Sequence, residues 1–230
     1  MSNNFLQYLS GSSGETWQQA LGRFALFCKN LHEIEVDGKV YEAFLDEYYE
    51  DGTLFEKLDA TQDSDLAAAE ASFNFSMPDE LKKLFQDRFA IYDTSIKFGR
   101  WGERTLLIIN KAWWENTFCL RPFCEAIAWN FGPYFADSEL SGSQIRLLNQ
   151  GYFCFGDWSD DDHSRSYLLV DRHGQYGHYD FHTEDYPGSL ERPTPLLNGN
   201  KFNKTLDQVL VWAIDKSISY LLDRNEIPCE

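Results

Sequence analysis

The sequence predicts an α+β fold, with an antiparallel sheet of about five or six strands flanked by helices and a C-terminal amphipathic helix. The order of the elements carries this prediction, because helical patterns come first, short strands follow, and the two do not alternate as in a βαβ fold. The composition supplies a core, since 43% of the 230 residues are hydrophobic and 16% are aromatic. We expect one α+β domain in residues 62–230, with residues 1–61 as a helical extension packed on it.

The N-terminal third carries helical patterns and many acids. Apolar residues recur with helical spacing over residues 15–34 and again over residues 40–50, and a third helix is expected near residues 64–73. Ten acidic residues and one base, Lys57, lie between Glu42 and Glu70. These acids indicate either a solvated helical face or a docking surface.

The segment that begins at Ser76 predicts a helix start. Ser76 can cap the helix, and Pro78 suits an early helical position, where its missing N–H costs no hydrogen bond. Asp79 and Glu80 favour the positive end of the helix dipole. The apolar residues that follow are expected to face the core: Leu81, Leu84 and Phe85.

The middle of the chain changes character. Residues 95–98 and 105–109 predict two strands linked by a glycine-containing turn. Residues 111–135 form an aromatic-rich helical segment that Pro122 breaks or restarts and that Gly132 and Pro133 end. Residues 144–148 indicate a short strand or a turn.

The last third predicts a strand at residues 152–155, an acidic loop at 156–164, a buried strand at 167–171 and a turn at 172–175. Residues 176–182 alternate as an exposed edge strand, and a long loop covers residues 184–200. An amphipathic helix over residues 203–224 starts at Asn203 or Thr205. Its expected inward stripe is Leu206, Val209, Leu210, Trp212, Ala213, Ile214, Ile218, Leu221 and Leu222.

Three of these features resemble the SUKH superfamily of fungal cell-wall synthesis regulators and their bacterial relatives. The first is the Pro-acid-acid-Leu helix start at residues 78–81. The second is the Phe-Gly-Asp segment at residues 155–157, followed by the apolar strand at 166–171. The third is the partner strand at 177–182 with the distal helix at 203–222. The resemblance covers about residues 62–224, and residues 1–61 have no counterpart.

The resemblance implies binding rather than catalysis. Many bacterial members are immunity proteins that neutralise toxin domains, and fungal members are regulators or scaffolds. The family has no shared catalytic motif, so we expect no enzyme, no catalytic residue and no cofactor. The leading hypothesis is an immunity protein, and the alternative is a non-enzymatic regulatory scaffold.

The net charge of −17 supports a basic protein partner, because a field of this sign repels nucleic acid and anionic membranes. A solubility role alone explains the charge equally well. A basic, nuclease-like toxin domain suits an acidic inhibitor. The expected partner-binding residues lie in two acidic loops that each hold an aromatic: Asp157, Trp158, Asp160, Asp161, Asp162, Glu184, Asp185 and Tyr186. Trp158 and Tyr186 are either interface anchors or rings folded back onto the protein.

Metal chemistry is the weakest hypothesis. His178, Asp180 and His182 share one face of a strand, which could hold a metal in a metal-dependent hydrolase but is also typical of any exposed strand. The acidic run after Asp157 fails the EF-hand pattern, because Asp162 stands at position six and Leu168 at position twelve. We expect no metal.

Five cysteines without a CxxC pair indicate free thiols in a reducing, cytoplasmic setting, and the polar first 14 residues do not form a signal peptide. Cys119, Cys124 and Cys154 are expected to be core residues rather than nucleophiles. No apolar run reaches about 18 residues, so no membrane span is expected. The sequence leaves the oligomeric state open.

Overall fold

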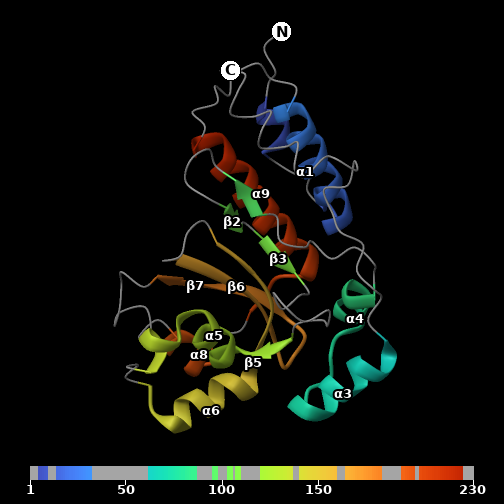
Figure 1. Ribbon diagram of the computed structural model, residues 1–230. Coiled ribbons are helices and arrows are strands. Elements are labelled where there is room, and N and C mark those ends of the chain that lie inside the picture. Colours follow the sequence, from blue (N-terminus) through green and yellow to red (C-terminus); the bar gives the residue numbers. More distant parts are fainter. Residues whose placement is uncertain are drawn as a thin grey trace.

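The computed structural model describes residues 5–9, 14–32, 62–86, 95–97, 103–105, 107–109, 120–136, 140–159, 164–182, 193–199 and 202–224. Figure 1 shows the arrangement of their helices and strands. The helices are η1 (Phe5–Tyr8), α1 (Trp17–His32), α3 (Asp63–Phe73), α4 (Asp79–Gln86), α5 (Phe123–Ala136), α6 (Gly142–Gly151), α8 (Thr194–Leu197) and α9 (Leu206–Arg224). The strands are β1 (Ser95–Lys97), β2 (Glu103–Thr105), β3 (Leu107–Ile109), β4 (Arg121–Pro122), β5 (Tyr152–Trp158), β6 (Ser164–Asp171) and β7 (Tyr176–His182).

The structure confirms the α+β class and the antiparallel sheet. Within the described residues the main sheet runs in the order β3-β5-β6-β7, and the two-residue β4 also pairs with β5. β5, β6 and β7 form a meander whose last turn covers residues 172–175, as predicted. β1 and β2 form a separate antiparallel pair, while β3 joins the main sheet, so the strand predicted at residues 105–109 is divided.

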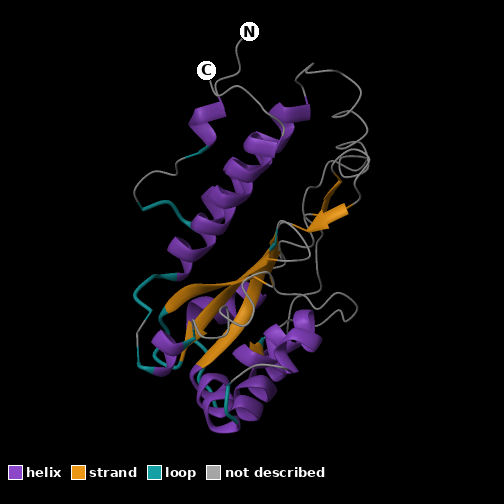
Figure 2. Ribbon diagram, turned by 90° about the vertical axis from the view of Figure 1, so that its left-hand side faces the viewer, coloured by secondary structure: helices purple, strands orange, loops and turns teal. Residues whose placement is uncertain are grey.

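Helices cover both faces of the sheet, as Figures 1 and 2 show. One face packs against α1, α4 and α9 through side chains such as Phe155, Leu168 and Tyr176. The other packs against α5 and α6 through Tyr167, Phe181 and their neighbours. β7 lies at the edge of the described sheet, as predicted, but it is not exposed, because Tyr176 and Phe181 are fully buried on opposite faces.

The predicted C-terminal helix is confirmed as α9, which begins at Leu206. A capping box starts it, since the Gln208 amide donates to Thr205 Oγ1 and the Thr205 amide donates to Gln208 Oε1. Trp212 of the predicted inward stripe is only partly buried, and the side chain of Leu221 lies outside the description. The other members of the stripe are buried: Leu206, Val209, Leu210, Ala213, Ile214, Ile218 and Leu222.

Four other helices differ from the sequence prediction. Residues 144–148 belong to α6 rather than to a strand, because Ser141 and Gln144 form a capping box. Gly132 and Pro133 do not end α5, which continues to Ala136 across a kink at Phe131. α8 interrupts the predicted long loop, and α4 begins at Asp79, directly after Pro78. The helix predicted over residues 40–50 lies outside the described residues.

The helices α1 and α9 pack side by side near the two termini of the chain (Figure 1). Their contact buries an apolar stripe of α1: Trp17, Ala20, Leu21, Phe24 and Phe27. None of the described helices is long and apolar enough to cross a membrane.

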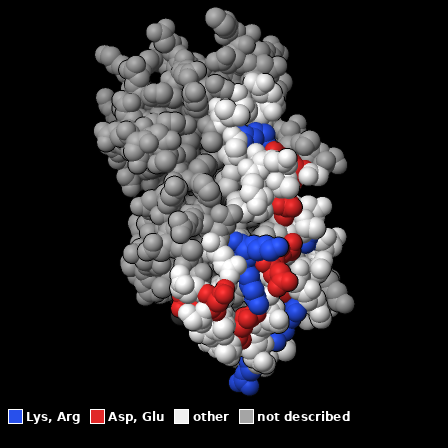
Figure 3. Space-filling view, turned by 90° about the vertical axis from the view of Figure 1, so that its right-hand side faces the viewer, with Lys and Arg blue, Asp and Glu red and all other residues white. Residues whose placement is uncertain are grey.

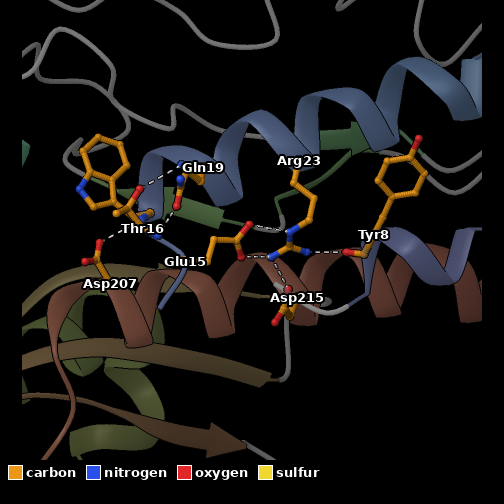
Figure 4. A network of polar contacts seen from close by, with 8 residues as sticks. Tyr8, Glu15, Thr16, Gln19, Arg23, Asp207 and Asp215 are labelled. Atoms are coloured by element: carbon orange, nitrogen blue, oxygen red, sulfur yellow. Dashed lines mark hydrogen bonds and ion pairs between the residues drawn. The ribbon is translucent and has the colours of Figure 1, made fainter. Parts of the chain in front are cut away.

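A polar network lies alongside this apolar contact, as Figure 4 shows. The Arg23 guanidinium donates to both carboxylate oxygens of Glu15, at 3.0 and 2.8 Å, and to the backbone carbonyl of Tyr8. It also pairs with Asp215 of α9 at 2.6 Å. The side chains of Arg23 and Glu15 are only 11% and 8% exposed, so this ionic network is largely withdrawn from water.

Gly177 of β7 offers a test of the packing, because a Cβ at this position would lie 2.3 Å from Cδ1 of Phe202. We expect Gly177→Ala to lower the free energy of unfolding by about 1–3 kcal/mol through overpacking. Urea unfolding of Gly177→Ala, Phe202→Leu and the double variant measures the coupling between the two sites. Gly142→Ala is the control, since nothing lies within 4 Å of its added methyl. Additive losses at Gly177 and Phe202 would contradict the close approach.

Candidate functional site

Two of the eight residues predicted to bind a partner lie in the described part of the chain, and they point to opposite faces of the sheet. Asp157 and Trp158 are the last two residues of β5, which extends three residues beyond the predicted strand. The other six lie outside the described residues: Asp160, Asp161, Asp162, Glu184, Asp185 and Tyr186.

A one-residue bulge in β5 decides where Trp158 lies. Cys154 pairs with Leu169 but Gly156 pairs with Leu168, so Phe155 is the extra residue. Strict alternation from Cys154 would send Trp158 toward α5, and the bulge turns it toward α9 instead. The indole is 3% exposed, and its Nε1 donates to Ser217 Oγ of α9 at 3.0 Å. Of the two predicted positions for Trp158, the structure has the indole folded back onto the protein. Trp158 does not lie in an exposed loop.

Asp157 points toward the α5 face of the sheet and forms an ion pair there. Arg165 of β6 donates to its carboxylate through Nη1, and the two side chains are 18% and 16% exposed. Burial opposes the charge on Arg165, but the Asp157 carboxylate outweighs it and raises the pKa of the guanidinium. The Asp157 carboxylate is therefore occupied by an ion pair within the sheet rather than presented to an external partner.

An indole–lysine cluster lies between α9 and the end of the sheet where Trp158 is buried, and it comprises Trp158, Ser166, His178, Asp180, Trp212 and Lys216. Lys216 Nζ stands 3.9 Å from the ring centroid of Trp158 and 5.1 Å from that of Trp212. It donates to Ser166 Oγ at 2.8 Å, and Ser166 Oγ donates to Asp180 Oδ1 at 2.5 Å. The ammonium group thus has two aromatic faces and a hydroxyl-bridged carboxylate around it.

His178 completes the cluster by stacking on Trp212. Their ring centroids are 3.8 Å apart and the planes differ by 6°. Burial lowers the pKa of His178; Lys204 and Lys216 lower it further, whereas Asp180 opposes this shift. The imidazole is consequently held in its neutral form at neutral pH.

The cluster contains a serine next to a lysine, the arrangement of some nucleophilic enzymes, but its geometry does not suit catalysis. Ser166 is 2% exposed, so a substrate carbonyl has no approach to its Oγ. Its proton also points to Asp180 rather than to Lys216. The hydroxyl therefore connects two charged side chains within the fold.

The described residues hold no group of three or more His, Cys, Asp or Glu side chains that could bind a metal. His178 and Asp180 share the α9 face of β7, as predicted, but His178 stacks on an indole and its Nε2 lies 3.9 Å from Asp180 Oδ2. The two cysteines of the described core, Cys124 and Cys154, are buried. Burial raises the pKa of Cys124 to about 12, which disfavours the reactive thiolate. Cys119 lies outside the described residues.

Charge is divided unevenly along the chain. The described residues hold 14 acidic and 13 basic side chains, a net charge of −1, whereas the remaining residues hold 23 acidic and 7 basic, a net charge of −16. Figure 3 shows acidic and basic side chains interspersed over the described part of one face. Almost all of the net negative charge therefore comes from residues outside the described ranges.

Two of these acidic segments are attached at the same end of the sheet. Residues 160–163 connect the end of β5 to the start of β6, and residues 183–192 follow the end of β7. The ends of all three strands are neighbours, because Trp158 pairs with Ser166 and Ser164 pairs with His182. The strand register therefore places the two attachment points side by side.

Comparisons with protein-family models, with curated proteins and with solved structures each yield no match. The resemblance to the SUKH superfamily accordingly stays a prediction.

Proposed function

We propose that this chain is an immunity protein of the SUKH type that binds a basic toxin domain and neutralises it without catalysis. The observation that carries the proposal is the common attachment of two acidic segments at one end of the sheet. These segments contain five of the six predicted partner-binding acids, Asp160, Asp161, Asp162, Glu184 and Asp185, together with Tyr186.

Electrostatics supports a basic partner at this end of the molecule. The described part of the chain is nearly neutral, so its field does not compete with that of the acidic segments. Clustered acids attract a basic surface over distances of about a Debye length, roughly 8 Å at physiological ionic strength. A toxin that binds phosphate groups must present such a surface. Association is then fast at low salt and slows as salt is added.

The triple variant Asp160→Asn, Asp161→Asn, Asp162→Asn tests the docking site. We expect about tenfold slower association with the toxin domain at low ionic strength, because steering contributes tenfold or more to on-rates. The difference should shrink at high salt. Stopped-flow or surface binding kinetics would measure it. The partner to test is the C-terminal domain of a large secreted protein whose gene neighbours that of this chain, where such a gene is present.

A matched control removes three exposed acids from the helices of the described part of the chain: Asp65→Asn, Asp79→Asn and Glu125→Gln. Equal slowing by both triple variants would show that net charge alone acts, and the site at the end of the sheet would be lost. Failure of the chain to protect cells that express the toxin domain would remove the immunity function itself.

The alternative function is a non-enzymatic regulatory scaffold. Affinity capture separates the two, since an immunity protein should retain one basic polypeptide in a one-to-one complex, whereas a scaffold should retain several host proteins. The metal-dependent hydrolase would instead need a bound ion that is lost when His178 and His182 are replaced by alanine.

A further inference from the structure

The His178–Trp212 stack joins β7 to α9. It places the titratable imidazole in surroundings that disfavour its protonated form. The imidazole is packed flat against the indole at 3.8 Å. Its Nδ1 is buried, and no side chain or backbone group in the described part of the chain bonds to it. Its Nε2 lies 3.9 Å from Asp180 Oδ2, which is beyond hydrogen-bond distance.

The charged groups around the ring come from each element that packs against it. Asp180 of β7 favours a protonated His178, but its other oxygen already accepts from Ser166. Lys216 of α9 and Lys204, which precedes α9, oppose protonation, and their Nζ atoms stand 5.1 and 5.8 Å from the centroid of the same indole. The indole also attracts a cation, so the attractions of Trp212 and Asp180 oppose burial and two ammonium groups.

We propose that the His178–Trp212 stack is an acid-sensitive contact, in which the neutral imidazole holds β7 against α9 and the protonated imidazole leaves the indole. Protonation gives both ring nitrogens a hydrogen, and the one on Nδ1 then faces no acceptor among the described residues. A buried charged donor without a partner is costly, and this cost is relieved when the ring turns to solvent.

The proposed release acts at the last strand in the described order of the sheet. β7 keeps its backbone pairing with β6, so the sheet survives, but its side-chain contact with the middle of α9 is lost. Trp212 then gains solvent exposure and keeps its lysine neighbours and its packing against the apolar core. The inference goes beyond the immunity function and holds whether or not a toxin partner exists.

A proton NMR titration of His178 in the wild-type protein tests the proposal. In the stacked neutral ring, the ring current of Trp212 should move the Cε1 proton upfield. We expect this displacement to disappear on acidification, with a midpoint below the ordinary histidine pKa of about 6.5. In Trp212→Leu, which assigns the effect, the upfield displacement should be absent at every pH.

The variant His178→Phe keeps an aromatic stack and removes the titration. Because the pKa of His178 is lowered in the folded state, its contribution to stability is complete above about pH 6.5 and is lost as the pH falls toward the folded-state value. The wild type should therefore lose more stability than His178→Phe across that window. A midpoint at or above about 6.5, or an upfield displacement that persists in the protonated ring, would overturn the proposal. Poor folding of His178→Phe would leave the wild-type titration as the deciding measurement.

Discussion

Replacing Arg23 by methionine is expected to lower the free energy of unfolding by about 3–5 kcal/mol, because it leaves the buried Glu15 carboxylate and the half-buried Asp215 carboxylate without their cation. Arg23 joins Glu15 to Asp215 and binds the carbonyl of Tyr8, so one side chain connects the start of the chain, α1 and α9. Methionine preserves most of the aliphatic packing of the arginine stem. Denaturant unfolding measures the loss.

The pH dependence of this loss separates a charge effect from a packing effect. Burial already raises the pKa of Asp215, although Arg23 partly counteracts the shift. Without Arg23 the Asp215 carboxylate should take up a proton at higher pH, which removes an unpaired charge. The destabilisation should therefore shrink as the pH is lowered. Arg146→Met on the exposed face of α6 is the control and should change stability little. A loss for Arg23→Met that does not vary with pH would contradict the ionic explanation.

Replacing Trp158 by alanine is also expected to lower the free energy of unfolding by about 3–5 kcal/mol, because truncation of a buried aromatic side chain removes buried apolar area and leaves a cavity. The indole is 3% exposed, donates to Ser217 and meets Tyr220 edge to face at 5.9 Å. An interface anchor would give the opposite result, with stability unchanged and partner binding lost.

The variant Trp158→Phe refines this test, because it keeps an aromatic ring under Lys216 but removes the Nε1 donor. We expect about 1 kcal/mol of destabilisation from the lost hydrogen bond, in addition to some loss of packing. Trp129→Ala provides the comparison, since this tryptophan of α5 is 51% exposed and its loss should cost much less. Similar thermal shifts for Trp158→Ala and Trp129→Ala would contradict the core position of Trp158.

Local sequence patterns were sufficient to predict those features that depend only on residues close together along the chain. The inward stripe of α9 and the turn at residues 172–175 follow from spacing and turn residues, whereas Pro78, predicted at an early helical position, precedes α4. The helix α6 was missed although its signal was present, because Ser141 and Gln144 form a capping box three residues apart.

The candidate site could not be read in the same way. Trp158 reaches α9 only because Phe155 bulges out of the β5–β6 ladder, and one extra residue reverses the direction of every side chain after it. Gly156 hinted at a bulge, since glycine within a strand often marks one. Lys216, Trp212 and His178 come from elements that are distant in sequence, and no spacing rule brings them together.

Composition, periodicity and turn residues were enough for the α+β class, the antiparallel strands of the last third and the amphipathic C-terminal helix. The three-dimensional packing was needed to show that helices cover both faces of the sheet, that Trp158 is a core residue, and that acids and bases nearly balance in the described residues. The physical reason is that periodicity tells which side chains share a face, whereas burial depends on what packs against that face from other parts of the chain.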